Sequence, residues 1–278
     1  MKKIIEKRNY IIFCLVILLG VGVLLIKKPI QEQTHNYYAF GESVIIKIYD
    51  NKDSSKIFKE IETIYEKWDK AYKSLYSKEK ITSDMSLLLD YGKKLSRETN
   101  GLLDININLL VKKIEENYDM QDYLNPINID SLIGSYVANE VQTYLKKNNI
   151  KKYLINQNGD IITGDHYNKE KYSISIHDAE DKVIKILYFT NKSLSVKGNT
   201  DMFQPYMVNP ITEKKSGENK IVAVISNDIK EADMLSRVLY LLSIKEGQEF
   251  IKKYTAEALW YSEDEIITTE GMKKYLKK

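Results

Sequence analysis

The chain has 278 residues, 43% of them hydrophobic, which is enough for one large core or two smaller ones. Its 42 basic and 39 acidic residues leave a formal net charge of only +3. A nucleic-acid-binding protein usually carries a concentrated basic stripe instead of this balance. The composition therefore predicts a folded protein and excludes nucleic acid as an expected partner.

The first 28 residues have the pattern of a membrane anchor. Four basic residues precede an uncharged run over 10–26, and two lysines follow it. About 17 residues is the lower limit for a helix that spans a bilayer, and the larger positive charge before the run predicts that the N-terminus stays in the cytoplasm. We therefore expect a single-pass anchor over 1–28 in the cell membrane, with the chain from about residue 30 outside the cytoplasm.

Two other interpretations fit this segment less well. A cleaved signal peptide needs small residues at its cleavage site, and residues 24–30 contain none. Lipoprotein processing at Cys14 would have Phe13 before the cysteine and most of the apolar run after it. Cys14 is the only cysteine, so the part outside the membrane is predicted to lack disulfides and thiol nucleophiles.

Beyond a short polar stalk expected over 29–37, strand and helix patterns follow one another without a regular strand–helix–strand alternation, which predicts an α+β fold in one domain over 38–278. Strands are predicted over 43–50, 151–157, 220–226 (an apolar run typical of a buried strand) and 256–262. Apolar and polar residues alternate over 171–178 and 182–190, which predicts that these two segments pair as a hairpin. Apolar residues at helical spacing predict helices over 57–75, 83–98 (with Ser83 as its N-cap), 137–149, 230–243, 245–254 and at the C-terminus.

Several short motifs have simple structural explanations when each is taken alone. The Gly in 99–104 follows a helix and is typical of a C-cap, and 155–160 has the composition of a turn. The Gly/Ser-containing helix start at 128–136 could hold a phosphate. Asp233 and Arg237 are spaced to form an i,i+4 ion pair, worth about 0.3–0.5 kcal/mol on a surface, or Asp233 could bind a metal. The histidines at 35, 166 and 177 share no metal-ligand spacing, and we expect structural or solvated roles for them.

Taken in order, these motifs resemble the FAD:protein FMN transferase (ApbE) family from about Tyr38 to the C-terminus. Residues 39–43 resemble its M-G-T element, with Gly41 kept, and 99–110 resemble T-x-G-A-F-D-x-T-V-x-P-L. The remaining matches are 127–139 with I-D-L-G-G-I-A-K-G-Y-A-x-D, 154–164 with L-x-N-x-G-G-D-I-x-x-x-G, 193–199 with A-I-A-T-S-G-x, 206–213 with H-I-I-D-P-x-T-G, and 231–242 with the A-D-A-L-A-T-A helix.

The resemblance implies an ApbE-like fold that binds FAD with Mg²⁺ and moves FMN onto a Thr or Ser hydroxyl of a partner, such as a membrane or exported redox protein. It also implies Asp233 as the metal-binding residue, and Tyr206 at the position of the family's catalytic His. The FAD-binding positions that it implies are Phe40, Gly41, Thr99, Leu103, Asp104, Asn156, Gly159, Asp160, Lys197 and Gly198.

The departures from the family pattern fall on its charged chemistry. Tyr206 replaces the His, and a Tyr with a pKa near 10 is a poor base at neutral pH. Gly134 replaces a Lys, and Arg237 replaces a Thr where it can pair with Asp233 and supply positive charge where a metal would sit. Three family aspartates are replaced by Asn128, Asn139 and Asn209. This pattern argues against a normal Mg²⁺ site.

We therefore expect a membrane-anchored, extracytoplasmic protein of the FMN transferase type whose transfer activity is weak or lost. One alternative is a protein of the same fold that binds flavin or a partner without catalysis. A second alternative is an unrelated exported α+β binding domain in which the order of the motifs is a coincidence.

Overall fold

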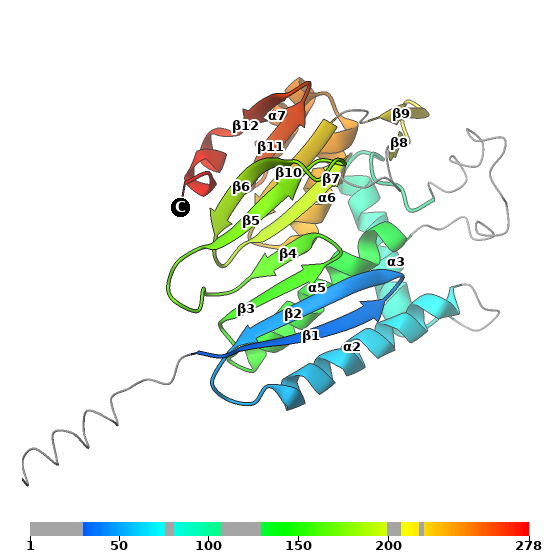
Figure 1. Cartoon of the computed structure of the whole chain (residues 1–278). Helices are drawn as coiled ribbons and strands as arrows, with labels where there is room; N and C mark the ends of the chain where they lie inside the picture. Colours follow the sequence, from blue (N-terminus) through cyan, green and yellow to red (C-terminus); the bar gives the residue numbers. More distant parts are fainter. Residues whose placement is uncertain (1–29, 76–80, 107–128, 199–206, 217–219, 278) are drawn as a thin grey trace, which may run out of the picture.

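The structure, a computed structural model, describes residues 30–75, 81–106, 129–198, 207–216 and 220–277 (Figure 1). The expected anchor over 1–28 lies outside these ranges. Among the helices within them, none has both the length and the apolar character that crossing a bilayer requires.

One eight-stranded sheet organises the described residues. Its strands run in the order β1-β2-β3-β4-β7-β10-β11-β12, and each neighbouring pair is antiparallel. The strands are β1 (Glu32–Ala39), β2 (Glu42–Tyr49), β3 (Tyr153–Gln157), β4 (Asp160–Thr163), β7 (Ser193–Gly198), β10 (Lys220–Ser226), β11 (Glu257–Ser262) and β12 (Glu265–Thr268). A largely antiparallel sheet with separate helices is the α+β arrangement that the element order predicts.

Helices cover one face of this sheet, and a hairpin covers part of the other (Figure 1). The helices are α2 (Ser55–Ser74), α3 (Ser83–Glu98), α5 (Asp130–Lys147), α6 (Ile229–Leu241) and α7 (Ile244–Ile251). The opposite face is covered near β10 by the hairpin of β5 (Tyr172–His177) and β6 (Val183–Phe189) and by the 3-10 helix η1 (Glu270–Tyr275). The predicted hairpin is thus confirmed.

Strand β10 shows how the two cores are separated. Val222 and Val224 belong to the large core beneath the helices, whereas Ile221, Ala223 and Ile225 belong to the smaller core beneath the hairpin. Successive side chains of a strand point to opposite faces. A strand that is apolar on both faces must therefore be central in the sheet, as β10 is.

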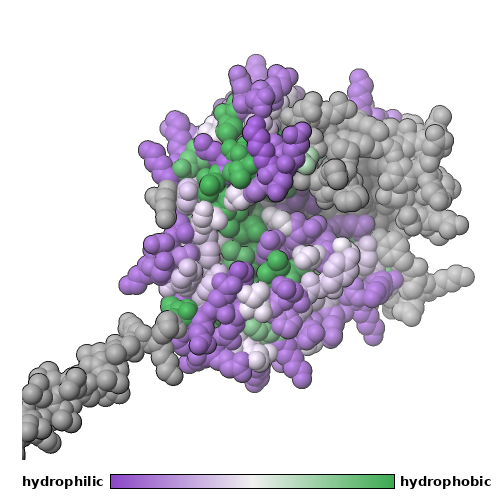
Figure 2. Space-filling model, in the orientation of Figure 1, coloured by the Kyte–Doolittle hydropathy of each residue, from purple (hydrophilic) through white to green (hydrophobic). Residues whose placement is uncertain are grey.

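Hydrophilic side chains surround an apolar middle on the face shown in Figure 2. The hairpin β5–β6 lies over this face near β7 and β10 (Figure 1). The strands β1 and β2 lie at one end of the sheet, away from this hairpin, and Tyr38 of β1 is exposed. The sheet is therefore covered unevenly, with helices along one side and a hairpin over only part of the other.

The expected stalk over 29–37 is wrong for most of its length, because residues 32–37 form most of strand β1. Its inward-facing polar side chains make specific contacts with α2. The Tyr37 hydroxyl donates to the Phe58 carbonyl at 2.6 Å, and the His35 ring stacks on the Phe58 ring. Polar composition alone resembled a stalk because an edge strand has one solvated face.

Other differences concern element boundaries. Helix α5 begins at Asp130, seven residues before the expected start at 137, and Thr82 rather than Ser83 caps α3, with its side chain accepting from the Met85 amide. The short strands β4, β7 and β12 were not expected. Each has at most six residues, too few to show a clear alternation.

Two adjacent leucines of α3 offer a matched test of this packing. Leu88 is fully buried in the large core, while Leu87 is 60% exposed. We expect Leu88→Ala to lower the free energy of unfolding by roughly 2–5 kcal/mol and Leu87→Ala by less than about 0.5 kcal/mol. Chemical denaturation of both variants measures the difference. Equal losses would contradict the orientation of α3.

Candidate functional site

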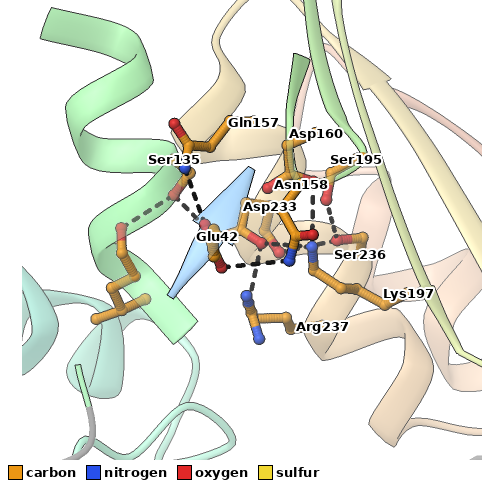
Figure 3. A network of polar contacts seen from close by, with 12 residues as sticks. Glu42, Ser135, Gln157, Asn158, Asp160, Ser195, Lys197, Asp233, Ser236 and Arg237 are labelled. Carbon is orange, nitrogen blue, oxygen red and sulfur yellow. Dashed lines mark hydrogen bonds and ion pairs between the residues drawn. The ribbon is translucent and has the colours of Figure 1, made fainter. Parts of the chain in front are cut away.

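A buried network of charged side chains lies where the sheet meets α5 and α6 (Figure 3). Asp160 is the first residue of β4, and Lys197 is the second-last residue of β7. Asp233 and Arg237 are one turn apart on α6. The antiparallel pairing of β4 with β7, and the packing of α6 against β7, bring these four residues together although they are far apart in the sequence.

The Asp233 carboxylate is the centre of this network (Figure 3). Its Oδ1 accepts from Arg237 Nε at 2.9 Å and lies 3.0 Å from Lys197 Nζ. Its Oδ2 accepts from the Ser135 hydroxyl of α5 at 2.9 Å. The side chain is only 2% exposed, so these three donors satisfy a carboxylate that water hardly reaches.

The two cations account for the ionisation of Asp233. Burial by itself would raise the pKa of Asp233, but the Arg237 guanidinium and the Lys197 ammonium outweigh it and hold the pKa below its ordinary value. Lys197 also lies 3.1 Å from Asp160 Oδ1. Burial raises the pKa of Asp160, with only partial opposition from Lys197. Asp233 is therefore the more firmly ionised of the two carboxylates.

The ion pair expected between Asp233 and Arg237 is confirmed, but it is not a surface pair. The side chains of Lys197 and Arg237 are 18% and 16% exposed. At such low exposure the ion pair between Asp233 and Arg237 is stronger than it would be in water. Removing one of the two partners therefore costs more free energy. Next to the network, the buried hydroxyls of Ser195 and Ser236 share a hydrogen bond of 2.9 Å that joins β7 to α6.

A third carboxylate, Glu42, lies at the edge of the network at the first position of β2 (Figure 3). Gln157 Nε2 donates to it at 2.9 Å, and Asn158 Nδ2 lies 3.4 Å away. Burial raises the pKa of Glu42, and the nearby Asp160 adds to this, while Gln157 and Lys197 oppose it. In the family pattern a Thr occupies this position, so Glu42 adds an acidic group to the site.

Glu42 occupies space that Gly134 of α5 leaves open. A Cβ atom built on Gly134 would lie 2.9 Å from Glu42 Oε2. The Lys of the family pattern could not be accommodated here without movement of the Glu42 side chain. A side chain at position 134 and Glu42 in its present rotamer would therefore compete for the same space.

Three of the expected FAD-binding side chains are hydrogen-bonded within their own turns. The Thr99 hydroxyl donates to the Leu95 carbonyl at 2.8 Å and accepts from the Leu103 amide at 3.1 Å. Asp104 accepts from the backbone and side chain of Asn106, and Asn156 accepts from the Gly159 amide at 2.8 Å. These side chains stabilise the backbone of their own turns.

Backbone conformation explains three of the other expected positions. Phe40 and Gly41 both have positive φ in the turn between β1 and β2, and the half-buried Phe40 ring packs beside Tyr65 and Tyr72. Gly198 has a φ of 136° at the end of β7, a conformation that side chains disfavour. The half-buried Leu103 packs against the large core.

The proline segment is described only from Met207 onward. Tyr206, the expected catalytic position, lies outside the described residues. Asn209 ends β8 (Met207–Asn209), and its Oδ1 accepts from the amides of Ile211 and Thr212. Here Asn209 stabilises the turn into β9 (Lys214–Ser216).

The sequence motifs led to Asp160, Lys197, Asp233 and Arg237 but not to Glu42, Ser135, Gln157 or Asn158. Glu42 had one usable signal, because it is a charged residue directly after the expected Gly41. The other three are polar residues inside helix, strand or turn patterns, where the side-chain direction decides whether they reach the site.

The network does not fit a Mg²⁺ ion. Mg²⁺ requires oxygen ligands at 2.0–2.1 Å in nearly octahedral geometry. The Asp233 oxygens here already accept from an ammonium, a guanidinium and a hydroxyl. Among the described residues, no three His, Cys, Asp or Glu side chains are grouped so that they could hold a metal. A cation placed at Asp233 would face two fixed positive charges.

Comparison with known proteins agrees with the resemblance seen in the motifs. The model of the ApbE family matches residues 120–260. A search of curated proteins found no match.

Solved structures with a similar fold come from several bacteria. Flavin transferase ApbE from Vibrio cholerae has a TM-score of 0.72 at 14% identity, covering 89% of this chain and 100% of that one. Flavinyl transferase ApbE from Pseudomonas stutzeri, in the apo form, has a TM-score of 0.71 at 16% identity, covering 91% and 100%. The ApbE protein from Thermotoga maritima has a TM-score of 0.72 at 15% identity, covering 89% and 100%. At these identities the likeness shows the fold.

Removing the central carboxylate should strongly destabilise the protein. Asp233→Asn keeps the side-chain volume but leaves Lys197 and Arg237 without their shared anion. We expect a loss of about 3 kcal/mol in the free energy of unfolding, the low end for a broken buried pair because both cations retain some solvent contact. Asp84→Asn, which breaks an exposed pair with Lys67, is the control and should cost no more than about 1 kcal/mol.

Glu42 should make stability depend on pH. Because folding raises its pKa above the ordinary 4.5, its contribution is fully present below pH 4.5 and is lost as the pH rises through the raised value. Glu42→Gln removes this loss, so we expect the variant to gain stability relative to the wild type between pH 4.5 and 8. Thermal unfolding across this range measures the gain. The exposed Glu265→Gln is the control, and a Glu42→Gln effect that does not change with pH would contradict the burial of this charge.

Proposed function

Because the chain belongs to the ApbE family, we propose that it is an extracytoplasmic, FAD-binding protein of the flavin transferase type whose transfer of FMN is slow. The observation that carries this proposal is the network around Asp233. It keeps the family's acidic positions within the family's fold, but it neutralises them with side chains of the protein itself.

Transfer of FMN is a phosphoryl-type reaction. A Thr or Ser hydroxyl of the acceptor forms a bond to the phosphorus of the FMN half of FAD, and the bond from that phosphorus to the oxygen shared with AMP breaks. AMP leaves with the bonding electrons, and the hydroxyl loses its proton. The protein must bind the diphosphate, neutralise its charge and hold the hydroxyl in line.

The side chains of this chain are well suited to bind the diphosphate and to neutralise its charge. They are less suited to remove the proton from the acceptor hydroxyl. Lys197 and Arg237 supply positive charge for the diphosphate, and the positive-φ positions at Gly41 and Gly198 let the backbone approach a ligand closely. Proton removal depends on position 206, where Tyr replaces the family's His. General-base help is worth roughly 10²–10⁴ in rate, which sets the size of the expected deficit.

The location outside the cytoplasm is also part of the proposal. The uncharged run over 10–26, with more positive charge before it than after it, supports an anchor with a cytoplasmic N-terminus. The sheet begins at Glu32, only a few residues after the expected anchor. The domain would therefore be held close to the membrane surface, where a membrane or exported redox protein is the expected flavin acceptor.

The reverse substitution at position 206 tests the slow-transfer proposal. The full chain, purified in detergent, is incubated with FAD and an acceptor protein that the Vibrio cholerae flavin transferase modifies, and attached FMN is measured by mass spectrometry. We expect slow or undetectable transfer by the wild type and an increase of about 10²-fold in Tyr206→His. Tyr188→His, on the far hairpin, is the matched control and should have no effect.

The outcomes separate the alternatives. Transfer by the wild type at the rate of the Vibrio cholerae enzyme would contradict the proposal. FAD binding without transfer in both the wild type and Tyr206→His would favour the non-catalytic flavin-binding alternative. Absence of FAD binding by calorimetry would contradict both.

A further inference from the structure

We propose that Lys197 and Arg237 together replace the divalent cation at this site, so that the protein binds the diphosphate of FAD without Mg²⁺. The inference rests on the proposed binding of FAD for its ligand. Its structural part, that two side-chain cations occupy the position of a metal, stands on the geometry of the network and can be tested without flavin.

Lys197 and Arg237 both stand at positions that are uncharged in the family pattern. In the family pattern that the sequence resembles, Lys197 stands at the Ser of A-I-A-T-S-G-x, and Arg237 stands at the Thr that follows the metal-binding Asp by four residues. Both are neutral hydroxyl residues in that pattern and cations here. One such change would add a single charge, whereas the two together supply the charge of one divalent ion.

Both cations converge on one oxygen atom. Lys197 Nζ and Arg237 Nε lie 3.0 and 2.9 Å from Asp233 Oδ1, although Lys197 belongs to β7 and Arg237 to α6 (Figure 3). Lys197 bridges on to Asp160 at 3.1 Å. A divalent ion held between two carboxylates would make the same connections, so the side chains reproduce its bridging role as well as its charge.

A metal ion and these two cations would compete for the same place beside Asp233. A Mg²⁺ ion would have to lie 2.0–2.1 Å from a carboxylate oxygen. With both cations on Oδ1 and Ser135 on Oδ2, such an ion would meet two positive charges within a few ångströms at low effective dielectric. Binding of Mg²⁺ is therefore disfavoured as long as Lys197 and Arg237 are present.

The two cations keep some contact with solvent, which a ligand would need in order to reach them. Their side chains are 18% and 16% exposed, while Asp233 beneath them is 2% exposed. Both cations are thus less buried than the anion that they share. Arg is well suited to phosphate because of its planar set of donors, and the bond from Nε to Asp233 fixes the orientation of that plane.

Mg²⁺ alone is the first probe, and it needs no flavin. Thermal unfolding of the full chain in detergent is followed in EDTA and in excess Mg²⁺, for the wild type and for Lys197→Ser/Arg237→Thr, which restores both residues of the family pattern. We expect Mg²⁺ to leave the wild type unchanged and to raise the unfolding temperature of the double variant. Lys252→Ser, which breaks an exposed pair with Glu249, is the control.

FAD binding by calorimetry is the second probe. For the wild type we expect the dissociation constant to agree within about twofold between EDTA and excess Mg²⁺. For the double variant we expect a loss of at least about tenfold in EDTA, because two charge-assisted contacts are removed, and a recovery in Mg²⁺. Arg237→Lys keeps the charge and should remain independent of Mg²⁺.

Three results would overturn the inference: a Mg²⁺-induced stabilisation of the wild type, tighter FAD binding by the wild type in Mg²⁺, or a folded double variant that does not respond to Mg²⁺. If the wild type binds no FAD, the proposed function fails, while the unfolding experiment still decides the metal question. If the double variant does not fold, Arg237→Thr alone takes its place and must gain a Mg²⁺ response.

Discussion

The buried carboxylate of Asp233 is the constraint on which the site depends. A carboxylate that is almost fully removed from water must be neutralised and hydrogen-bonded, or it destabilises the fold by several kcal/mol. Ser135, Lys197 and Arg237 meet this requirement from three different elements, α5, β7 and α6. The charge of one side chain therefore links α5, β7 and α6 at one buried point.

This constraint connects the altered residues to one another. A buried anion needs positive charge in every variant of the site, whether a bound ion or a side chain supplies it. When Lys197 and Arg237 supply this positive charge, Asp233 no longer needs a bound metal ion. Similarly, the half-buried Glu42 carboxylate lies in the space beside Gly134, within 2.9 Å of where a Cβ atom would be. Two pairs of departures from the family pattern are thus related in space: Lys197 and Arg237 share one anion, and Glu42 lies beside Gly134.

The scaffold around the site is held by contacts that do not depend on this chemistry. Thr99 and Asn209, two residues of the family motifs or their replacements, make hydrogen bonds within their own turns. The sheet is anchored by β10, whose two faces belong to separate cores. A fold that is stabilised in this way can keep its shape while the charges of its site change, which agrees with TM-scores of about 0.7 at identities near 15%.

The sequence by itself determined the α+β class, the long helices, the central strand and the hairpin, because each has a local periodicity that is independent of its neighbours. It also determined the family, through the order of motifs that are individually weak, and it indicated Asp233 and Arg237 as partners through their helical spacing. Only the tertiary structure decided that this pair is buried, that Lys197 joins it and that Glu42 lies beside Gly134. It also decided that residues 32–37 form an edge strand. These features depend on which segments of the chain meet in the folded protein. Lys197 and Asp233, and likewise Glu42 and Gln157, are far apart in the sequence, so the spacing of residues along the chain does not predict their contacts.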